Sequence, residues 1–163
     1  MKVQPITFKG QPENYAKISN ALSRSAQPQK DDFIWLKEQG VTDIINFRTM
    51  FVSGVDYDEK TLVESLGMKY HNIPSVTKEP KEGNILEFLK MVESVKEQGG
   101  KTHIHCMAGA DRTGMYSYIY KTLNKIGSQS ENQAEMLKMG HDKIRYPNLL
   151  PWINKFINKM LKK

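Results

Sequence analysis

The chain has 163 residues, of which 39% are hydrophobic and 26% are charged, and its formal net charge at pH 7 is +6. This length suits one domain, and no apolar run approaches the roughly 18 residues that a membrane span needs. We divide the chain into an N-terminal extension over residues 1–15 and a single domain over residues 16–163.

The cysteine count and the N-terminus narrow the class of protein further. A single cysteine, Cys106, excludes an intramolecular disulfide and a cysteine-rich metal site. Lys2 and Lys9 are not followed by a continuous apolar stretch, so residues 1–15 lack the central part of a secretory signal. We therefore expect a cytoplasmic protein. The positive charge favours anionic partners, although scattered lysines also serve simply as a solvated surface.

Short β-branched runs alternate with longer helical periods along the chain, which is typical of an α/β fold. Because helices separate the expected strands, we predict a central, mainly parallel sheet of about four to five strands, flanked by helices on both faces. A loop is predicted over residues 74–84, which hold two prolines and a glycine. The strands are expected over residues 18–25, 41–47, 68–73 and 102–105, and the helices over residues 33–39, 58–65, 85–95, 115–126, 131–139 (with Ser130 as its N-cap) and 149–161.

The segment after the last expected strand is the candidate ligand site. Ligands of open α/β sheets bind beyond the carboxyl ends of the strands. A short loop that turns back into a helix points backbone amides inward, and the helix N-terminus adds partial positive charge, so a phosphate dianion is the expected ligand. The strand delivers to this position the run His105-Cys106-Met107-Ala108-Gly109-Ala110-Asp111-Arg112-Thr113-Gly114.

Several side chains of this loop suit phosphate chemistry. The positive field favours a thiolate, which makes Cys106 a candidate nucleophile. After five intervening residues, Arg112 can offer two parallel donors to the phosphoryl oxygens, a geometry that lysine cannot reproduce. Thr113 can donate its hydroxyl to the sulfur. Gly109 permits a positive φ at the apex of the loop, and Gly114 allows the following helix to pack closely against its neighbours.

The loop carries the pattern His-Cys-x5-Arg-Thr, and its stretch Cys-x-Ala-Gly-x-Asp-Arg-Thr-Gly closely resembles the loop of bacterial tyrosine, dual-specificity and phosphoinositide phosphatases. On these residues the chain resembles the cysteine-dependent protein tyrosine phosphatase superfamily. The resemblance extends more weakly to residues 23–28, 41–48 and 67–74, so that it covers most of residues 18–126.

The resemblance implies hydrolysis of a phosphomonoester in two steps. Cys106 would attack phosphorus to give a phosphocysteine, and water would then hydrolyse it, with no metal and no cofactor. The backbone amides of the loop and the arginine would hold the phosphate oxygens. The phosphate-binding residues would be Met107, Ala108, Gly109, Ala110, Asp111 and Arg112.

The general acid is the part of the site that departs from the family. Family members usually supply an aspartate from a loop that precedes the cysteine, but residues 74–84 contain no aspartate. Related myotubularin-type phosphatases use an aspartate of the catalytic loop itself, and we therefore favour Asp111, with a purely structural hydrogen bond as the alternative role. Glu79 is the next candidate, and Asp56 or Asp58 comes after it.

Roles are also expected for the other polar residues near the site. His105 adjoins the nucleophile, but neighbouring strand residues face opposite ways, so we expect it to act on the thiolate through hydrogen bonds and not as a base. Arg48 has two alternative roles, substrate contact or a structural ion pair, and Arg24 is expected to have a structural role. Core or surface roles are expected for the remaining histidines, His71, His103 and His141.

The leading function is that of a protein tyrosine or dual-specificity phosphatase, whose partner is a phosphorylated protein and not a nucleic acid. The alternative is a phosphoinositide or inositol phosphate phosphatase. In the phosphoinositide phosphatase related to tensin, loop lysines stand where this chain has Met107 and Ala110, although Lys78 and Lys81 flank the expected site here. The second alternative is a non-catalytic phosphate-binding module.

Overall fold

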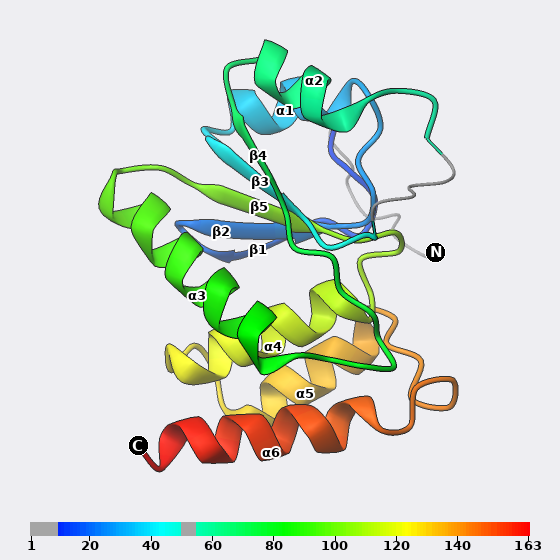
Figure 1. Cartoon of the computed structure of the whole chain (residues 1–163), viewed down its shortest axis with the longest axis vertical. Coiled ribbons are helices and arrows are strands. Elements are labelled where there is room, and N and C mark those ends of the chain that lie inside the picture. Colours follow the sequence, from blue (N-terminus) through cyan, green and yellow to red (C-terminus); the bar gives the residue numbers. More distant parts are fainter. Residues whose placement is uncertain (1–9, 50–54) are drawn as a thin grey trace, which may run out of the picture.

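A five-stranded sheet in the order β1-β2-β5-β3-β4 lies at the centre of the computed structural model, which describes residues 10–49 and 55–163 (Figure 1). Strands β2, β5, β3 and β4 are parallel, and the edge strand β1 runs antiparallel to β2. The predicted α/β class and mainly parallel sheet are confirmed. Residues 1–9 of the predicted N-terminal extension lie outside the described ranges. The strands are β1 (Ala16–Ser19), β2 (Leu22–Ser25), β3 (Asp43–Asn46), β4 (Lys69–Asn72) and β5 (Thr102–His105).

The prediction of one strand over residues 18–25 is wrong, because this segment contains a tight turn between β1 and β2. The hydroxyl of Ser19 accepts a hydrogen bond from the backbone N–H of Ala21 at 3.1 Å. Such a local hydrogen bond stabilises a turn, although the hydrophobic pattern by itself predicts that the strand continues through this point. Ile18 and Leu22 are both buried, so the pattern gave no sign of the reversal.

Helices cover both faces of the sheet, as parallel strands require. Figure 1 shows α1 and α2 on one face and α3 to α6 on the other, with α4 between the sheet and the outer helices. None of the helices in the described ranges is long and apolar enough to cross a membrane. Their bounds are α1 (Asp32–Glu38), α2 (Glu59–Ser65), α3 (Glu82–Glu97), α4 (Arg112–Leu123), α5 (Gln129–Lys138) and α6 (Leu149–Leu161).

Three helix starts differ from the prediction. Helix α3 begins at Glu82, three residues before the predicted start, so the last residues of the predicted loop over residues 74–84 are helical. Helix α4 begins at Arg112, three residues before the predicted start, so the arginine of the loop already belongs to the first turn. Helix α5 is capped by Ser128 and not by Ser130: Ser128 Oγ accepts the N–H of Glu131 at 3.1 Å, and the carboxylate of Glu131 accepts the N–H of Ser128 at 3.2 Å. This reciprocal pair satisfies two amides that a cap at Ser130 would leave free.

Candidate active site

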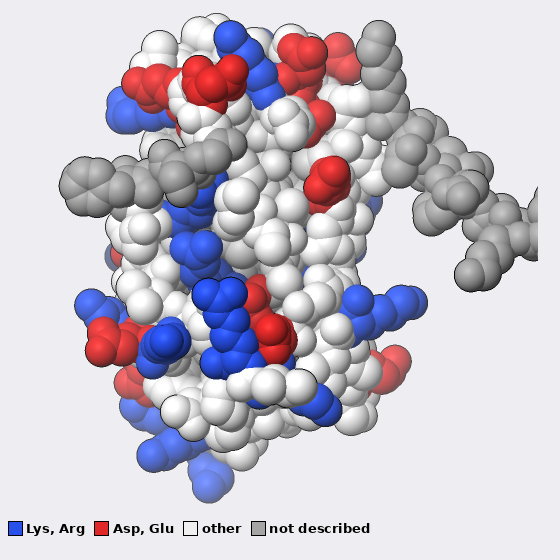
Figure 2. Space-filling model, turned by 90° about the vertical axis from the view of Figure 1, so that its right-hand side faces the viewer, with Lys and Arg blue, Asp and Glu red and all other residues white. Residues whose placement is uncertain are grey.

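The loop between β5 and α4 lies at the carboxyl edge of the parallel strands, on the right-hand side of Figure 1. Figure 2 faces this side of the molecule and shows Lys and Arg side chains gathered along the middle of it. The site that the sequence predicted therefore lies on a surface rich in positive charge, which attracts phosphate groups.

Gly109 shapes the apex of the loop. Its φ of +72° lies in the left-handed region, and a Cβ there would lie 2.6 Å from the backbone nitrogen of Ala26. The loop is also held from behind, because the buried Arg24 donates to the carbonyl of Gly109 and the N–H of Gln27 donates to the carbonyl of Met107 at 2.9 Å. The predicted positive φ and the structural role of Arg24 are thus both seen. Burial lowers the pKa of Arg24 below its ordinary value.

Gly114 lies in the first turns of α4, where a Cβ would come within 3.0 Å of the Met136 side chain. This contact agrees with the prediction that a glycine here lets helices pack closely, and the neighbour is α5.

Replacing Gly109 by alanine should destabilise the loop and impair the site. The left-handed backbone alone costs about 1–2 kcal/mol for an alanine, and the clash with the chain after β2 adds to this. The free energy of unfolding from urea melts measures the loss. Gly83→Ala in α3 is the matched control, since a Cβ there meets nothing within 4 Å, and we expect it to be neutral or to stabilise by about 0.5–1 kcal/mol. Equal stabilities for the two variants would contradict this role of Gly109.

Cys106 is buried at the start of the loop, with 2% of its surface exposed. The adjacent His105 points away from the site: its Nδ1 lies 3.2 Å from the carbonyl oxygen of Cys106, and its Nε2 lies 2.8 Å from the carboxylate of Glu59. Both ring nitrogens of His105 therefore have partners other than the sulfur of Cys106, the candidate nucleophile. The partner Glu59 was not predicted, because it lies 46 residues away in the sequence.

A chain of hydrogen bonds continues from Glu59 to a second arginine. The Gln27 amide donates to Glu59 Oε1 at 2.7 Å, and Arg48 donates to Gln27 Oε1 at 3.0 Å. Burial and the positive charge of Arg112 lower the pKa of Arg48, while the charges of Glu59 and Cys106 act in the opposite direction. Arg48 thus lies within the electrostatic reach of both ends of the loop.

Arg112 and Thr113 open helix α4 at the other end of the loop. Arg112 is partly buried, and its NH1 donates to the carbonyl of Ser75 at 3.5 Å, which links the site to the loop over residues 74–81. Ser75 is itself fixed by the hydroxyl of Tyr116 at 2.7 Å. The hydroxyl of Thr113 is buried and makes no hydrogen bond within the described ranges, so a bond to the Cys106 sulfur is not formed here.

Asp111 binds a segment that the sequence did not connect to the site. Its Oδ1 accepts the Nδ1–H of His141 at 2.7 Å and the backbone N–H of Asp142 at 3.0 Å. His141, for which a core or surface role was expected, is buried and in direct contact with the loop between β5 and α4. Asp111 therefore makes structural hydrogen bonds, and their donors belong to the turn after α5.

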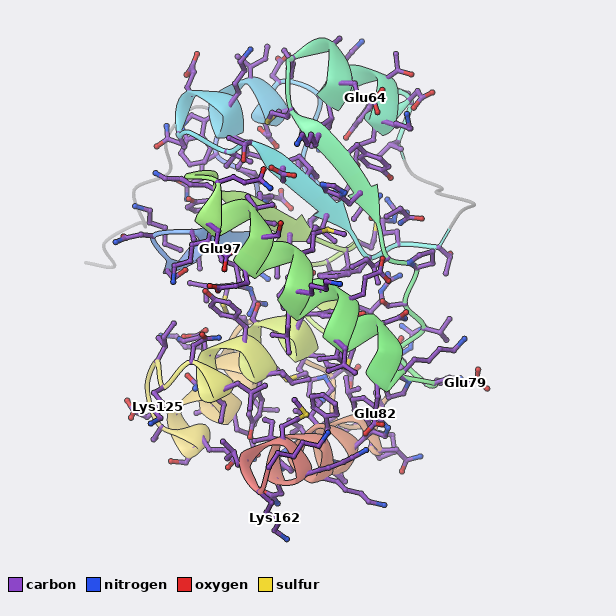
Figure 3. The ribbon with its side chains drawn as sticks, turned by 60° about the vertical axis from the view of Figure 1, so that its left-hand side comes forward. Glu64, Glu79, Glu82, Glu97, Lys125 and Lys162 are labelled. Atoms are coloured by element: carbon purple, nitrogen blue, oxygen red, sulfur yellow. The ribbon has the colours of Figure 1, made fainter. Side chains whose placement is uncertain are left out.

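In the described part of the chain, none of the other carboxylates considered as the acid is hydrogen-bonded to the loop between β5 and α4. Glu79 is exposed, and Figure 3 shows it pointing away from the body of the molecule. Glu82 forms an ion pair with Lys159 at 3.0 Å. Asp58 caps α2 by accepting the N–H of Thr61 at 3.2 Å, and Asp56 is exposed.

His103 and His71 lie on strands of the sheet and make hydrogen bonds to neighbouring strands. His103 is fully buried, and its two ring nitrogens each lie 2.7 Å from a hydroxyl, those of Ser23 and Ser25. Burial lowers the pKa of His103 well below its ordinary value, followed by a smaller effect of His105. His71 pairs with Asp43 at 2.8 Å. These two residues match the core and surface roles expected for them.

A cysteine and an arginine at the two ends of the loop between β5 and α4, placed at the carboxyl edge of an α/β sheet, form the arrangement expected of the cysteine-dependent phosphatases. The model of the family described as "Polymorphic toxin system, DSP-PTPase phosphatase" matches residues 19–123, more than half of the chain. The chain belongs to this family of dual-specificity and protein tyrosine phosphatase type. It is a cysteine-dependent phosphatase.

Solved structures share the fold. A DUF442 protein from Shewanella putrefaciens CN-32 is 23% identical, with a TM-score of 0.77 over 95% of this chain and 96% of the other. TpbA from P. aeruginosa is 18% identical, with a TM-score of 0.72 over 88% and 84%. The core catalytic domain of the PP-IP phosphatase SIW14 from S. cerevisiae is 18% identical, with a TM-score of 0.71 over 91% and 85%. No curated protein sequence matches the chain.

Proposed function

We propose that the protein hydrolyses phosphomonoesters with Cys106 as nucleophile, Arg112 as phosphate clamp and Asp111 as general acid. The thiolate attacks phosphorus, the phosphorus–oxygen bond to the leaving group breaks, and Asp111 gives that oxygen its proton. Water then attacks the phosphocysteine, Asp111 takes a proton from it, and orthophosphate leaves. The observation that carries this proposal is the loop itself, which places the buried cysteine and the arginine on either side of the left-handed apex at Gly109.

The backbone amides of the loop and Arg112 supply the electrostatic part of catalysis. They are fixed before substrate arrives, because Arg24 and Gln27 hold the loop from behind. Donors that are already oriented stabilise the charge on the equatorial oxygens without reorganisation. Thr113, whose buried hydroxyl has no partner in the described part of the chain, is available to donate to the sulfur when the thiolate leaves.

We infer that the substrates are phosphorylated proteins, phosphotyrosine above all. Three apolar side chains are exposed on the segments that meet at the site: Met107 on the catalytic loop, Val76 beside Ser75, and Ile144 just beyond Asp142. Exposed apolar residues around a phosphate site suit the aromatic ring and flanking side chains of a peptide. TpbA has been crystallised with phosphotyrosine. A reduced thiol favours the cytoplasm, which is the location that we propose.

A second candidate substrate is an inositol phosphate or phosphoinositide. It is favoured by a cavity of about 230 Å³ whose lining includes Lys78 and Arg145, which could bind a further phosphate group. Lys78 comes three residues after Ser75, and Arg145 follows the turn that binds Asp111. SIW14 is described as a PP-IP phosphatase.

A substrate panel with a charge-neutralised variant separates the two candidates. We expect kcat/KM to be higher for phosphotyrosine peptides than for inositol phosphates and phosphoinositides. Lys78→Gln/Arg145→Gln should change the value for the peptides by less than about threefold, because exposed charges contribute little at a distance from the reacting group. The control pair is Lys125→Gln/Lys162→Gln, which lies away from this face (Figure 3). A preference for inositol phosphates that falls tenfold or more in the first variant alone would contradict the protein-substrate proposal.

A further inference from the structure

We propose that His141 is a positioning residue for catalysis, which fixes Asp111 in the orientation needed to transfer a proton. This inference rests on the proposed function. It assigns a role to a histidine 30 residues from Asp111 that no sequence pattern connects with the site.

The turn after α5 is fastened to the catalytic loop at several points. A Cβ on Gly140, whose φ is +115°, would lie 3.2 Å from the Cβ of Ala110, so these two segments of the chain pack closely there. The side chain of Asn14 donates to the carbonyl of Met139 at 3.0 Å and also reaches the carbonyl of Ala108 at 3.3 Å. These contacts place the imidazole of His141 against the loop. Its hydrogen bond to Asp111 is one of several contacts between the loop and the turn after α5.

The two oxygens of the Asp111 carboxyl group have different hydrogen-bonding environments. Both donors found in the described ranges, His141 Nδ1 and the amide of Asp142, go to Oδ1. Asp111 sits at the N-cap position of α4 yet makes no side-chain cap bond, so its orientation is set by this turn and not by its own helix. With Oδ1 held, Oδ2 becomes the oxygen that carries the transferable proton.

The choice of histidine is not explained by packing. The side chain of His141 is 0% exposed, and its Nε2 is buried without a hydrogen-bond partner in the described part of the chain. A buried polar atom without a partner destabilises the folded state, and an apolar residue of similar size would avoid this cost. Such groups are uncommon in native structures and call for a functional explanation. The donor at Nδ1 supplies that explanation.

A purely structural role makes a different prediction. The carboxylate of Asp142 accepts the N–H groups of Ile144 at 3.1 Å and Arg145 at 2.9 Å, so the turn that binds Asp111 also carries two exposed side chains. If Asp111 and His141 only anchored this turn, their loss would weaken substrate binding and raise KM. If they position the acid, their loss lowers the rate of phosphocysteine formation, and it does so most for poor leaving groups, which depend on protonation.

The test compares His141→Asn with His141→Gln on p-nitrophenyl phosphate and phenyl phosphate. The amide nitrogen of asparagine can occupy the place of Nδ1, whereas that of glutamine falls near Nε2. We expect His141→Gln to lower the single-turnover rate of phosphocysteine formation about 10²-fold for phenyl phosphate and only a few-fold for p-nitrophenyl phosphate, with KM little changed. His141→Asn should stay within about tenfold of wild type on both substrates. Asp111→Asn should show the pattern of the glutamine variant, and the double variant Asp111→Asn/His141→Gln should be no worse.

The matched control is His71→Asn, which removes the Nε2 donor and so breaks a histidine–aspartate pair of similar length at Asp43, the first residue of β3, away from the loop between β5 and α4. It should leave the ratio of the two rates unchanged. Equal losses on both substrates in His141→Gln, equal rates for its asparagine and glutamine variants, or additive effects with Asp111→Asn would each overturn the proposal. Failure of the proposed function is seen separately, as a wild-type protein that turns over neither substrate.

Discussion

Replacing Cys106 by serine should lower kcat on aryl phosphates by on the order of 10⁴-fold or more, as loss of the nucleophile does in enzymes with covalent intermediates. The serine hydroxyl is not ionised near neutral pH and is a much poorer nucleophile than a thiolate. The substitution exchanges one buried atom at the start of the loop, so the hydrogen bonds that hold Gly109 and Met107 remain. Phosphate binding measured by calorimetry should therefore persist while turnover is lost.

This pair of measurements also separates an enzyme from a binding module. Wild-type turnover that disappears in Cys106→Ser supports the phosphocysteine route. Phosphate binding by the wild-type protein without turnover of any phosphomonoester would point to the non-catalytic module. Residual turnover in the serine variant close to that of wild type would show that another group attacks phosphorus.

Arg112→Lys should lower kcat/KM by about 10²–10³-fold, even though the positive charge is kept. Arginine offers two parallel donors to two phosphoryl oxygens, and a lysine ammonium cannot reproduce this geometry. Lysine would also lose the contact between Arg112 NH1 and the carbonyl of Ser75, which ties the loop over residues 74–81 to the site. The measurement is steady-state kinetics on p-nitrophenyl phosphate.

Arg112→Ala provides the comparison for the lysine variant. If the bidentate geometry dominates, the lysine and alanine variants should lie within about tenfold of each other. If charge alone matters, lysine should approach wild type, and a loss of less than about threefold in Arg112→Lys would contradict the role assigned to the arginine.

The parts of the site that the sequence predicted are local in the chain. Within the run from Cys106 to Gly114, the left-handed glycine and the start of the helix depend on neighbouring residues and could therefore be predicted. The parallel sheet could likewise be predicted, because helices separate its strands. The β1–β2 turn was missed, since a single hydrogen bond from the amide of Ala21 to Ser19 decides it.

The residues that orient this loop could not be predicted, because they come from distant segments. Glu59 reaches His105 across 46 residues, and His141 reaches Asp111 across 30. Neither pair belongs to a periodic pattern, and each forms only after α2 or the turn after α5 has packed against the sheet edge. Polar partners of buried groups are set by tertiary structure, and composition and spacing carry no sign of them.

The most direct test of the central claim is to trap the intermediate. Rapid acid quench of the protein during turnover of p-nitrophenyl phosphate, followed by peptide mass spectrometry, should find one phosphoryl group on the peptide that contains Cys106. The adduct should accumulate further in Asp111→Asn, in which the base for its hydrolysis is lost. Turnover at full rate with no phosphoryl adduct on Cys106, or with the adduct on another residue, would contradict the account.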